Sequence, residues 1–188
     1  MRNPRLSYGL MLLLCVPVAS VAQRHRDPLT QAEINQVRDT SWEPKLRLPL
    51  YVEFARNRMV KLEEMRSDPK TKDRGRQTHD LLDDFQLLYD ELNDNIETYV
   101  DRRDDIRKPL KVIIEADTEF QSKLRALKDA AGVTAAEAQQ YEFVLTNAIE
   151  TVDSSVEDHR KLLSDQEALA KQKKLVKDAS KGTGVSPE

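Results

Sequence analysis

The pattern of apolar positions is most regular between Thr78 and Ala131. Apolar residues recur there at alternating steps of three and four, the spacing that places side chains on one face of an α-helix. Only Arg103 and Asp117 interrupt this stripe. Its apolar members are Leu81, Phe85, Leu88, Leu92, Ile96, Tyr99, Ile106, Leu110, Ile113, Phe120, Leu124 and Leu127. The pattern predicts a long amphipathic helix that buries one face against partner helices.

Pro109 leaves the path of this stretch open. A proline inside a helix removes a hydrogen bond and costs about 3 kcal/mol or more. The stripe nevertheless keeps its phase from Ile106 through Leu110 to Ile113, which a loop has no reason to preserve. We therefore favour a kinked or briefly interrupted rod. The alternative is a reversal of the chain at residues 102–108.

The chain before this stretch predicts two shorter helices. Thr30 and Glu33 have the spacing of a capping box, so a first helix starts there and ends near Asp39. Residues 41–44 form a corner, because the residue before a proline avoids the helical region. A second helix follows.

The second helix is expected from about Leu46 to Arg66, with Pro49 delaying its start. The strongly basic segment 70–76 contains Gly75 and is interpreted as a loop or a frayed helical turn. This loop would separate the second helix from the long stripe.

Gly132 predicts the end of a helix, because glycine takes the left-handed conformation without a steric penalty. Thr134 and Glu137 have the spacing of a second capping box. We expect a last helix over residues 135–176 and a disordered tail over 178–188. The face of the last helix comprises Tyr141, Val144, Ala148, Val152, Ser155, His159, Leu162, Gln166 and Leu169.

These elements predict an all-α fold: an elongated antiparallel helix bundle, or long helical hairpin, with two shorter N-terminal helices in one domain over residues 23–177. The last helix would lie antiparallel to the rod, and the second helix would pack on its first half. Val112, Ile114, Phe143 and Leu145 lie off the main stripes. They need further cover, either from a chain turned back at Pro109 or from a second subunit.

The first 22 residues have the composition of a secretory signal peptide. Arg2 and Arg5 precede a short apolar run, and Ala22 is a small residue before the expected cleavage site. We expect cleavage after Ala22 and export to the periplasm or medium, with no membrane span in the mature chain. Leu14 before Cys15 disfavours lipidation, since a small residue is required there.

The composition supports a helical protein and disfavours several classes of function. Of the 188 residues, 34% are charged and only 5 are glycine, which is typical of long solvated helices. The formal net charge of −3 lacks the basic footprint of nucleic-acid binders. Cys15 is the only cysteine and leaves with the signal peptide, so no disulfide is expected.

We predict no catalytic, cofactor-binding or metal-binding residue. The three histidines, His25, His79 and His159, do not have the Glu-x-x-His spacing of di-metal bundles. Loops with EF-hand spacing and the Gly-x-Ser-x-Gly turn of hydrolases are both missing from the sequence. We interpret His159 as a packed, hydrogen-bonded residue. The acidic ladder of Asp90, Asp94, Glu97, Asp101 and Asp104 is interpreted as a solvated face.

Arg103 and Asp117 have two interpretations because they interrupt an apolar stripe. In the first, Arg103 packs its stem and extends its charged head to the edge of the bundle. In the second, the polar positions form an inter-helix ion pair that fixes register.

Three segments resemble uncharacterised secreted helical proteins of acidobacterial type: residues 89–95, residues 105–108 and residues 158–167. The resemblance implies an exported bacterial protein. It implies no activity and no site residues.

We expect an exported, non-enzymatic interaction or scaffold protein of the bacterial envelope, or a chaperone-like module, that acts through amphipathic helix faces. Its partner would be another protein or a second copy of itself, and no nucleic acid. The alternative is a small-ligand or metal-binding bundle with a pocket near Tyr99, Arg103, Asp117 or His159.

Overall fold

The computed structural model describes residues 27–182 and is all-helical over that range, as predicted. The predicted signal peptide over residues 1–22, the start of the predicted domain at residues 23–26 and the tail residues 183–188 lie outside the described residues. Within the described range the helices are α1 (Gln31–Asp39), α2 (Pro44–Ser67), α3 (Arg74–Asp101), α4 (Arg107–Lys128), α5 (Ala135–Ala138) and α6 (Glu142–Gly182).

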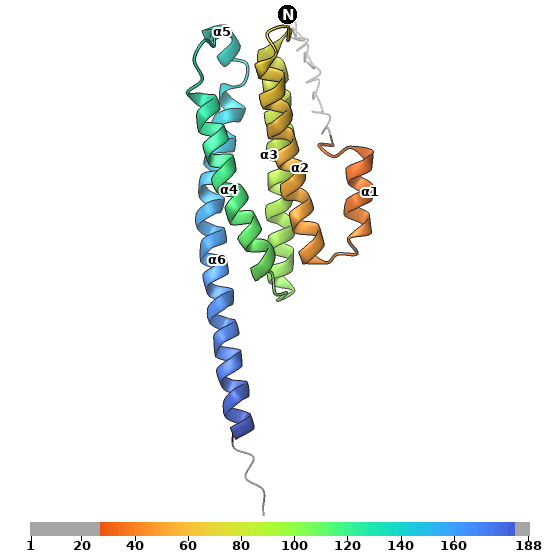
Figure 1. Ribbon diagram of the computed structural model, residues 1–188, viewed down its shortest axis with the longest axis vertical. Helices are drawn as coiled ribbons and strands as arrows, with labels where there is room; N and C mark the ends of the chain where they lie inside the picture. The colour runs from red at the N-terminus through yellow and green to blue at the C-terminus, as the bar shows by residue number, and fades with distance from the viewer. Residues whose placement is uncertain (1–26, 183–188) are drawn as a thin grey trace, which may run out of the picture.

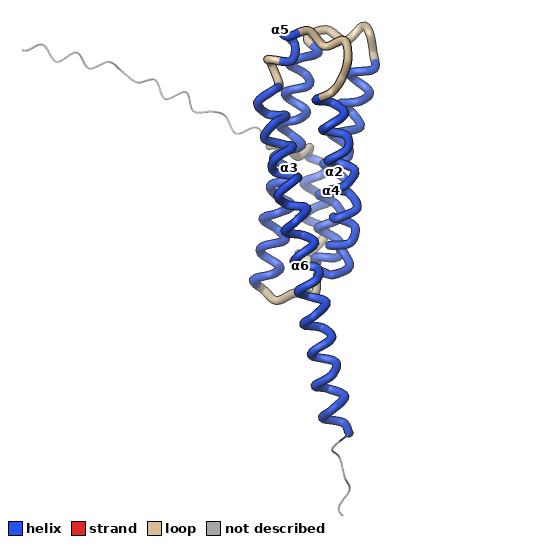
Figure 2. Tube along the Cα trace, turned by 90° about the vertical axis from the view of Figure 1, so that its left-hand side faces the viewer, coloured by secondary structure: helices blue, strands red, loops and turns tan. Residues whose placement is uncertain are grey.

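The four long helices α2, α3, α4 and α6 form an elongated bundle, and successive long helices run in opposite directions (Figures 1 and 2). The closest packing joins α2 to α3 and α4 to α6, whereas α2 with α4 and α3 with α6 close the remaining sides. The short α1 packs on α2, and α5 packs on α3 at one end. The stripe of the sequence supplies much of the core.

The kinked-rod prediction is wrong, and the alternative reversal is what the chain adopts. α3 ends at Asp101, and α4 returns from Arg107. Asp104 N donates to Tyr99 O and Arg103 N donates to Val100 O, each at 2.9 Å. These are the two bonds of a Schellman turn, with Arg103 at its left-handed position (φ 62°).

Pro109 is harmless in this arrangement because it lies in the first turn of α4, where the backbone amides have no intrahelical partner. Both halves of the stripe face the core, so Ile106, Leu110 and Ile113 are fully buried. As a result only the second half of the stripe, α4, runs antiparallel to α6, while the first half, α3, runs parallel to it (Figure 1). The expected packing of the second helix on the first half of the stripe is confirmed by α2 and α3.

The predicted capping box of α1 is confirmed. Thr30 Oγ1 accepts from Glu33 N at 3.3 Å, and the Glu33 carboxylate accepts from Thr30 N at 2.7 Å. Arg58 of α2 also donates to both Glu33 oxygens, each at 2.7 Å, in a nearly buried bidentate pair. This carboxylate therefore caps α1 and fastens it to α2.

The predicted second capping box is half formed. Thr134 Oγ1 accepts from Glu137 N at 3.2 Å. The Glu137 carboxylate binds Arg74 at 2.8 Å and Arg66 at 3.2 Å instead of reaching back to the cap. Gly132 has the expected positive φ of 77°. The tight turn at Gly132 therefore forms as predicted. Glu137, however, links this turn to α2 through Arg66 and to α3 through Arg74.

The last helix differs from the prediction at both ends. A turn over residues 139–141 separates α5 from α6, so the helix does not run unbroken from Ala135. At the other end α6 reaches Gly182, and residues 178–182 of the predicted disordered tail are helical. α3 also starts earlier than expected and includes Gly75, where an added Cβ would lie 2.6 Å from Gln140 Oε1. The missing side chain lets the α5 corner approach α3.

Replacing Arg103 by glycine is expected to raise the free energy of unfolding by about 1 kcal/mol, because glycine has no Cβ to clash in the left-handed region. Urea unfolding measures the change. The matched control is Arg102→Gly, at a right-handed position with φ −72°, which should lower stability. An Arg103→Gly variant no more stable than the parent would contradict the turn.

Glu33 should make the docking of α1 sensitive to acid. Burial by itself raises the pKa of this carboxyl, but hydrogen bonds from Arg58 and Thr30 outweigh it and lower the pKa to about 2. Because the folded-state pKa lies below the unfolded value of 4.5, the stabilisation is complete above that value and is lost as the pH falls towards 2.

The Glu33→Gln variant should therefore be less stable than the parent by up to about 3 kcal/mol near neutral pH, and the gap should close towards pH 2. Urea unfolding as a function of pH measures this difference. Glu53→Gln removes an exposed carboxylate of α2 and is expected to leave the pH profile unchanged. A gap that did not change with pH would contradict the assignment.

Candidate functional site

Two of the four residues named for a candidate pocket come together in the structure. Asp117 of α4 and His159 of α6 form a buried pair, with 2.9 Å between Asp117 Oδ2 and His159 Nδ1. Arg103 lies in the exposed turn after α3, and Tyr99 packs elsewhere in the core. Asp117 therefore forms an inter-helix pair, as one of the two sequence interpretations expected. Its partner is His159, and Arg103 does not contact it.

Asp117 is fully buried and hydrogen-bonded through both carboxylate oxygens. Oδ1 accepts from the Tyr89 hydroxyl of α3 at 2.7 Å, and Oδ2 faces the His159 ring. A buried carboxylate without partners would cost several kcal/mol. The two bonds therefore bring α3, α4 and α6 to a single common register.

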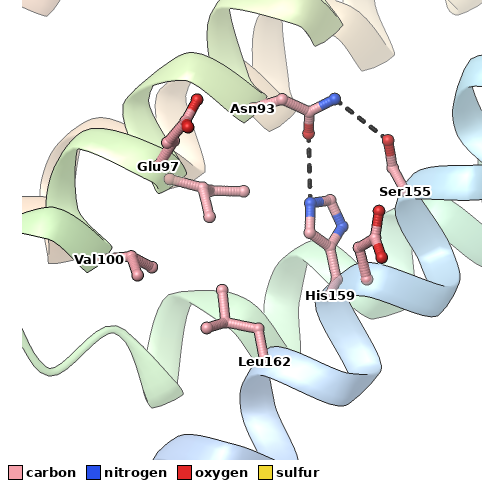
Figure 3. A pocket seen from close by; sticks show the side chains of 8 residues that line it. Asn93, Glu97, Val100, Ser155, His159 and Leu162 are labelled. Carbon is pink, nitrogen blue, oxygen red and sulfur yellow. Dashed lines mark hydrogen bonds between the residues drawn. The ribbon is translucent and has the colours of Figure 1, made fainter.

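His159 has a polar atom at each ring nitrogen, as the sequence interpretation of a packed, hydrogen-bonded histidine predicted. Its Nε2 lies 3.2 Å from Asn93 Oδ1, and Asn93 Nδ2 donates to Ser155 Oγ at 3.1 Å. Figure 3 shows Asn93 of α3 bridging the two α6 side chains. Tyr89, Asp117, His159, Asn93 and Ser155 therefore form one continuous network.

The network is compatible with two proton arrangements. With oxygen atoms at both ring nitrogens, a doubly protonated His159 donates to Asp117 and to Asn93. Rotating the Asn93 amide by 180° would instead let Asn93 donate to a neutral ring and accept from Ser155. In both arrangements Asp117 accepts from the Nδ1–H group, so this carboxylate orients the imidazole.

Tyr89 closes the network on the core side. Burial raises the pKa of its phenol, and the negative charge of Asp117 raises it further. The hydroxyl is therefore held as a hydrogen-bond donor. The Tyr89 ring stacks on Phe85 with centroids 5.8 Å apart, and Phe120 meets both rings edge to face. These aromatic contacts exclude water from one side of Asp117.

A groove of about 350 Å³ opens on the other side of the network, between α3 and α6. His159, Asn93 and Ser155 line it beside three apolar side chains, and two carboxylates complete it. The remaining lining residues are Ile96, Glu97, Val100, Asp158 and Leu162 (Figure 3). A ligand or segment that fits this groove would be apolar along one side and positively charged at its edges.

The residue types Asp, His and Ser invite comparison with a hydrolase triad, but their order here differs. In such a triad the serine hydroxyl contacts the histidine nitrogen opposite the aspartate. Here Asn93 occupies that nitrogen, and the Ser155 hydroxyl contacts the Asn93 amide. The arrangement fixes the positions of side chains rather than activating Ser155.

Tyr99 and Arg103 contribute to a different region of the bundle. Tyr99 is fully buried, and its hydroxyl has no hydrogen-bond partner within the described residues. Burial raises the pKa of this phenol, although the nearby charges of Arg47 and Arg102 act in the opposite direction. The Arg102 guanidinium lies 5.4 Å from the Tyr99 ring centroid. Neither Tyr99 nor Arg103 lines the groove.

Sequence reasoning missed Tyr89 and Asn93 as members of the site. They are separated by one helical turn on α3, as Ser155 and His159 are on α6. That spacing puts each pair on one helix face, but only the packing of α3 beside α6 makes the two faces meet.

Between residues 27 and 182, the structure gathers no group of three or more His, Cys, Asp or Glu side chains suited to hold a metal ion. Over the same residues, every helix is too short or too polar to cross a membrane.

Comparison with known proteins identifies no relative: no family model, curated protein or solved structure matches the chain.

Asp117→Leu is expected to lower the free energy of unfolding by about 3 kcal/mol, because it leaves Tyr89 and His159 buried without their acceptor. The double variant Asp117→Leu/His159→Leu should cost less than the sum of the two single variants, with a coupling of about 1–3 kcal/mol. Urea unfolding of the four proteins completes the cycle.

Glu115→Leu serves as the control, since Glu115 is an exposed carboxylate on the same helix. Its substitution should change stability by no more than about 0.5 kcal/mol. Additive effects of Asp117→Leu and His159→Leu would show that the two side chains do not act as a pair.

Proposed function

We propose that the protein is an exported, non-enzymatic interaction or scaffold module of the bacterial envelope that binds another protein through its helix faces. One observation carries the proposal: α6 continues far beyond the bundle that it helps to form (Figure 1). Near the end of the bundle, Gln166 forms hydrogen bonds with Asp104 and Ile106 in the turn after α3, and Glu167 pairs with Lys111 of α4. We call residues 168–182 the α6 extension.

The α6 extension exposes large apolar side chains. Leu169, Leu175 and Val176 are 55%, 70% and 65% exposed. Isolated helices shorter than about 12–15 residues are only marginally stable in water, and packing supplies most helix stability in proteins. A protruding helix with exposed leucine and valine is therefore suited to pack against something else.

The polar residues of the α6 extension support the same function. Lys171, Lys173 and Lys174 are exposed around the apolar positions. An amphipathic helix with basic edges is a common form of recognition segment, docking its apolar face in a groove. Bacterial export is part of the proposal, on the strength of the N-terminal sequence and of the resemblance carried by residues 89–95, 105–108 and 158–167.

The proposal is tested by cross-linked capture from the native host, comparing the full chain with its Leu169→Glu/Val176→Glu variant. Both positions are exposed, so the variant should keep its circular dichroism spectrum and thermal unfolding. We expect envelope proteins that the parent retains to be lost from the variant, because a charge on the apolar face opposes docking.

A matched control is Ser164→Glu/Ala168→Glu, which adds the same two charges at exposed positions away from the Leu169 and Val176 face. This control should capture the same proteins as the parent. Identical capture by the parent and by Leu169→Glu/Val176→Glu would contradict the proposed function.

The second candidate function is a small-ligand site in the groove between α3 and α6. The favouring observation is the polar floor of His159, Asn93 and Ser155 beside an apolar wall. Native mass spectrometry of protein purified from its host would show a retained small molecule, and His159→Leu should abolish that retention. A spectrum of the bare chain would count against this candidate.

A further inference from the structure

The face of α6 that lines the groove continues unbroken along the α6 extension. Its positions follow alternating steps of four and three residues, so they share one side of the helix. Leu162 lines the groove and Gln166 bonds to the turn after α3. Beyond that turn the same face presents Leu169, Lys173 and Val176, which are all exposed.

The groove and the α6 extension are complementary in charge. Glu97 and Asp158 stand in the groove lining, and Asp94 and Asp101 are exposed on the neighbouring face of α3. The α6 extension carries exposed Lys171, Lys173 and Lys174. Glu97 of the acidic ladder therefore lines the groove, with Asp94 and Asp101 exposed beside it, and this side of the groove suits a basic helix.

The groove and the α6 extension also both carry apolar side chains. Leu162 of α6 lines the groove, and Ile96 and Val100 add apolar surface from α3. On the α6 extension, the exposed Leu169 and Val176 stand two helical turns apart on one side of the helix. A two-fold contact would use both surfaces at once, because each copy supplies one groove and one extension.

We infer that a second copy of this chain occupies the groove: the α6 extension of each copy lies antiparallel in the α3–α6 groove of the other, about a two-fold axis near Asp165 and Gln166. In this register Leu162 lies opposite the partner copy's Leu169, and Asp158 lies opposite its Lys173. This inference rests on the proposed function, protein binding through helix faces, and identifies the bound protein as a second copy of the chain.

The shape of the chain accommodates this pairing. The α6 extension leaves the bundle beyond the turn that joins α3 to α4, and no other helix among residues 27–182 follows it there (Figures 1 and 2). Two bundles joined in this way sit end to end, so their bodies do not collide. The pairing covers Leu169 and Val176, and it places lysines beside Glu97 and Asp158.

Sedimentation equilibrium of the chain from Gln23 onward tests the inference, and a dimer is expected. Lys173→Glu should weaken the dimer by about tenfold or more, because each copy then sets a glutamate against Asp158. Asp158→Lys should weaken it similarly. The double variant Asp158→Lys/Lys173→Glu should restore it, since the charge pair is exchanged and not removed.

Oxidative cross-linking tests the register. Cys15 is the only cysteine and precedes Gln23, so Leu162→Cys/Leu169→Cys introduces the sole thiols. Along one helix these positions are about 10 Å apart, too far for a disulfide within one copy. Oxidation should therefore give a covalent dimer. Leu169→Cys alone should not, because that position meets its own copy only in a parallel pair.

The outcomes separate this inference from the proposed function. A chain that stays monomeric at about 100 μM, well above the micromolar range of weak complexes, overturns the self-pairing. A host protein whose capture still depends on Leu169 and Val176 would then leave the proposed function standing. A dimer unaffected by Leu169→Glu/Val176→Glu, or covalently linked by Leu169→Cys alone, would place the contact elsewhere and also overturn the inference.

Discussion

The structure depends on a negative charge buried where three helices meet. Asp117 is inaccessible to water and accepts hydrogen bonds from Tyr89 on α3 and His159 on α6. Leucine packing tolerates small shifts between helices, whereas a buried carboxylate is costly unless both partners are in place. The pair therefore selects one register of α3, α4 and α6 from several that apolar packing would allow.

The same network accounts for the groove. Asn93 and Ser155 extend the hydrogen bonds from His159 outward along the seam between α3 and α6. A seam occupied by amides and hydroxyls is not filled by interlocking leucines, and α3 packs less closely on α6 than α4 does. The polar residues that fix the register thus leave an opening beside them, lined by α3 and α6.

Local sequence predicted the helices and most of the buried positions, because both follow from the periodicity of the chain. The capping box at Thr30 and Glu33 and the left-handed Gly132 formed as predicted, since the atoms involved lie within a few residues of each other. His159 was also correctly interpreted as a hydrogen-bonded histidine. Its partners were not found, because Tyr89, Asn93 and Asp117 lie on other helices and no local pattern joins them.

By itself, then, the sequence determined an all-α chain, the faces of its helices that are buried, and the left-handed glycine at Gly132. Only the tertiary structure decided that the stripe turns back at Arg103. Arg103 has a left-handed backbone conformation, and because glycine is the usual residue at such positions, an arginine there does not mark a turn in the sequence. The apolar period is unchanged by this reversal, because a straight rod and a folded pair can bury the same positions. The direction that the chain takes after α3 depends on a few turn residues and on contacts between helices that are distant in the sequence. The spacing of apolar residues along the chain carries no information about these turn residues or contacts.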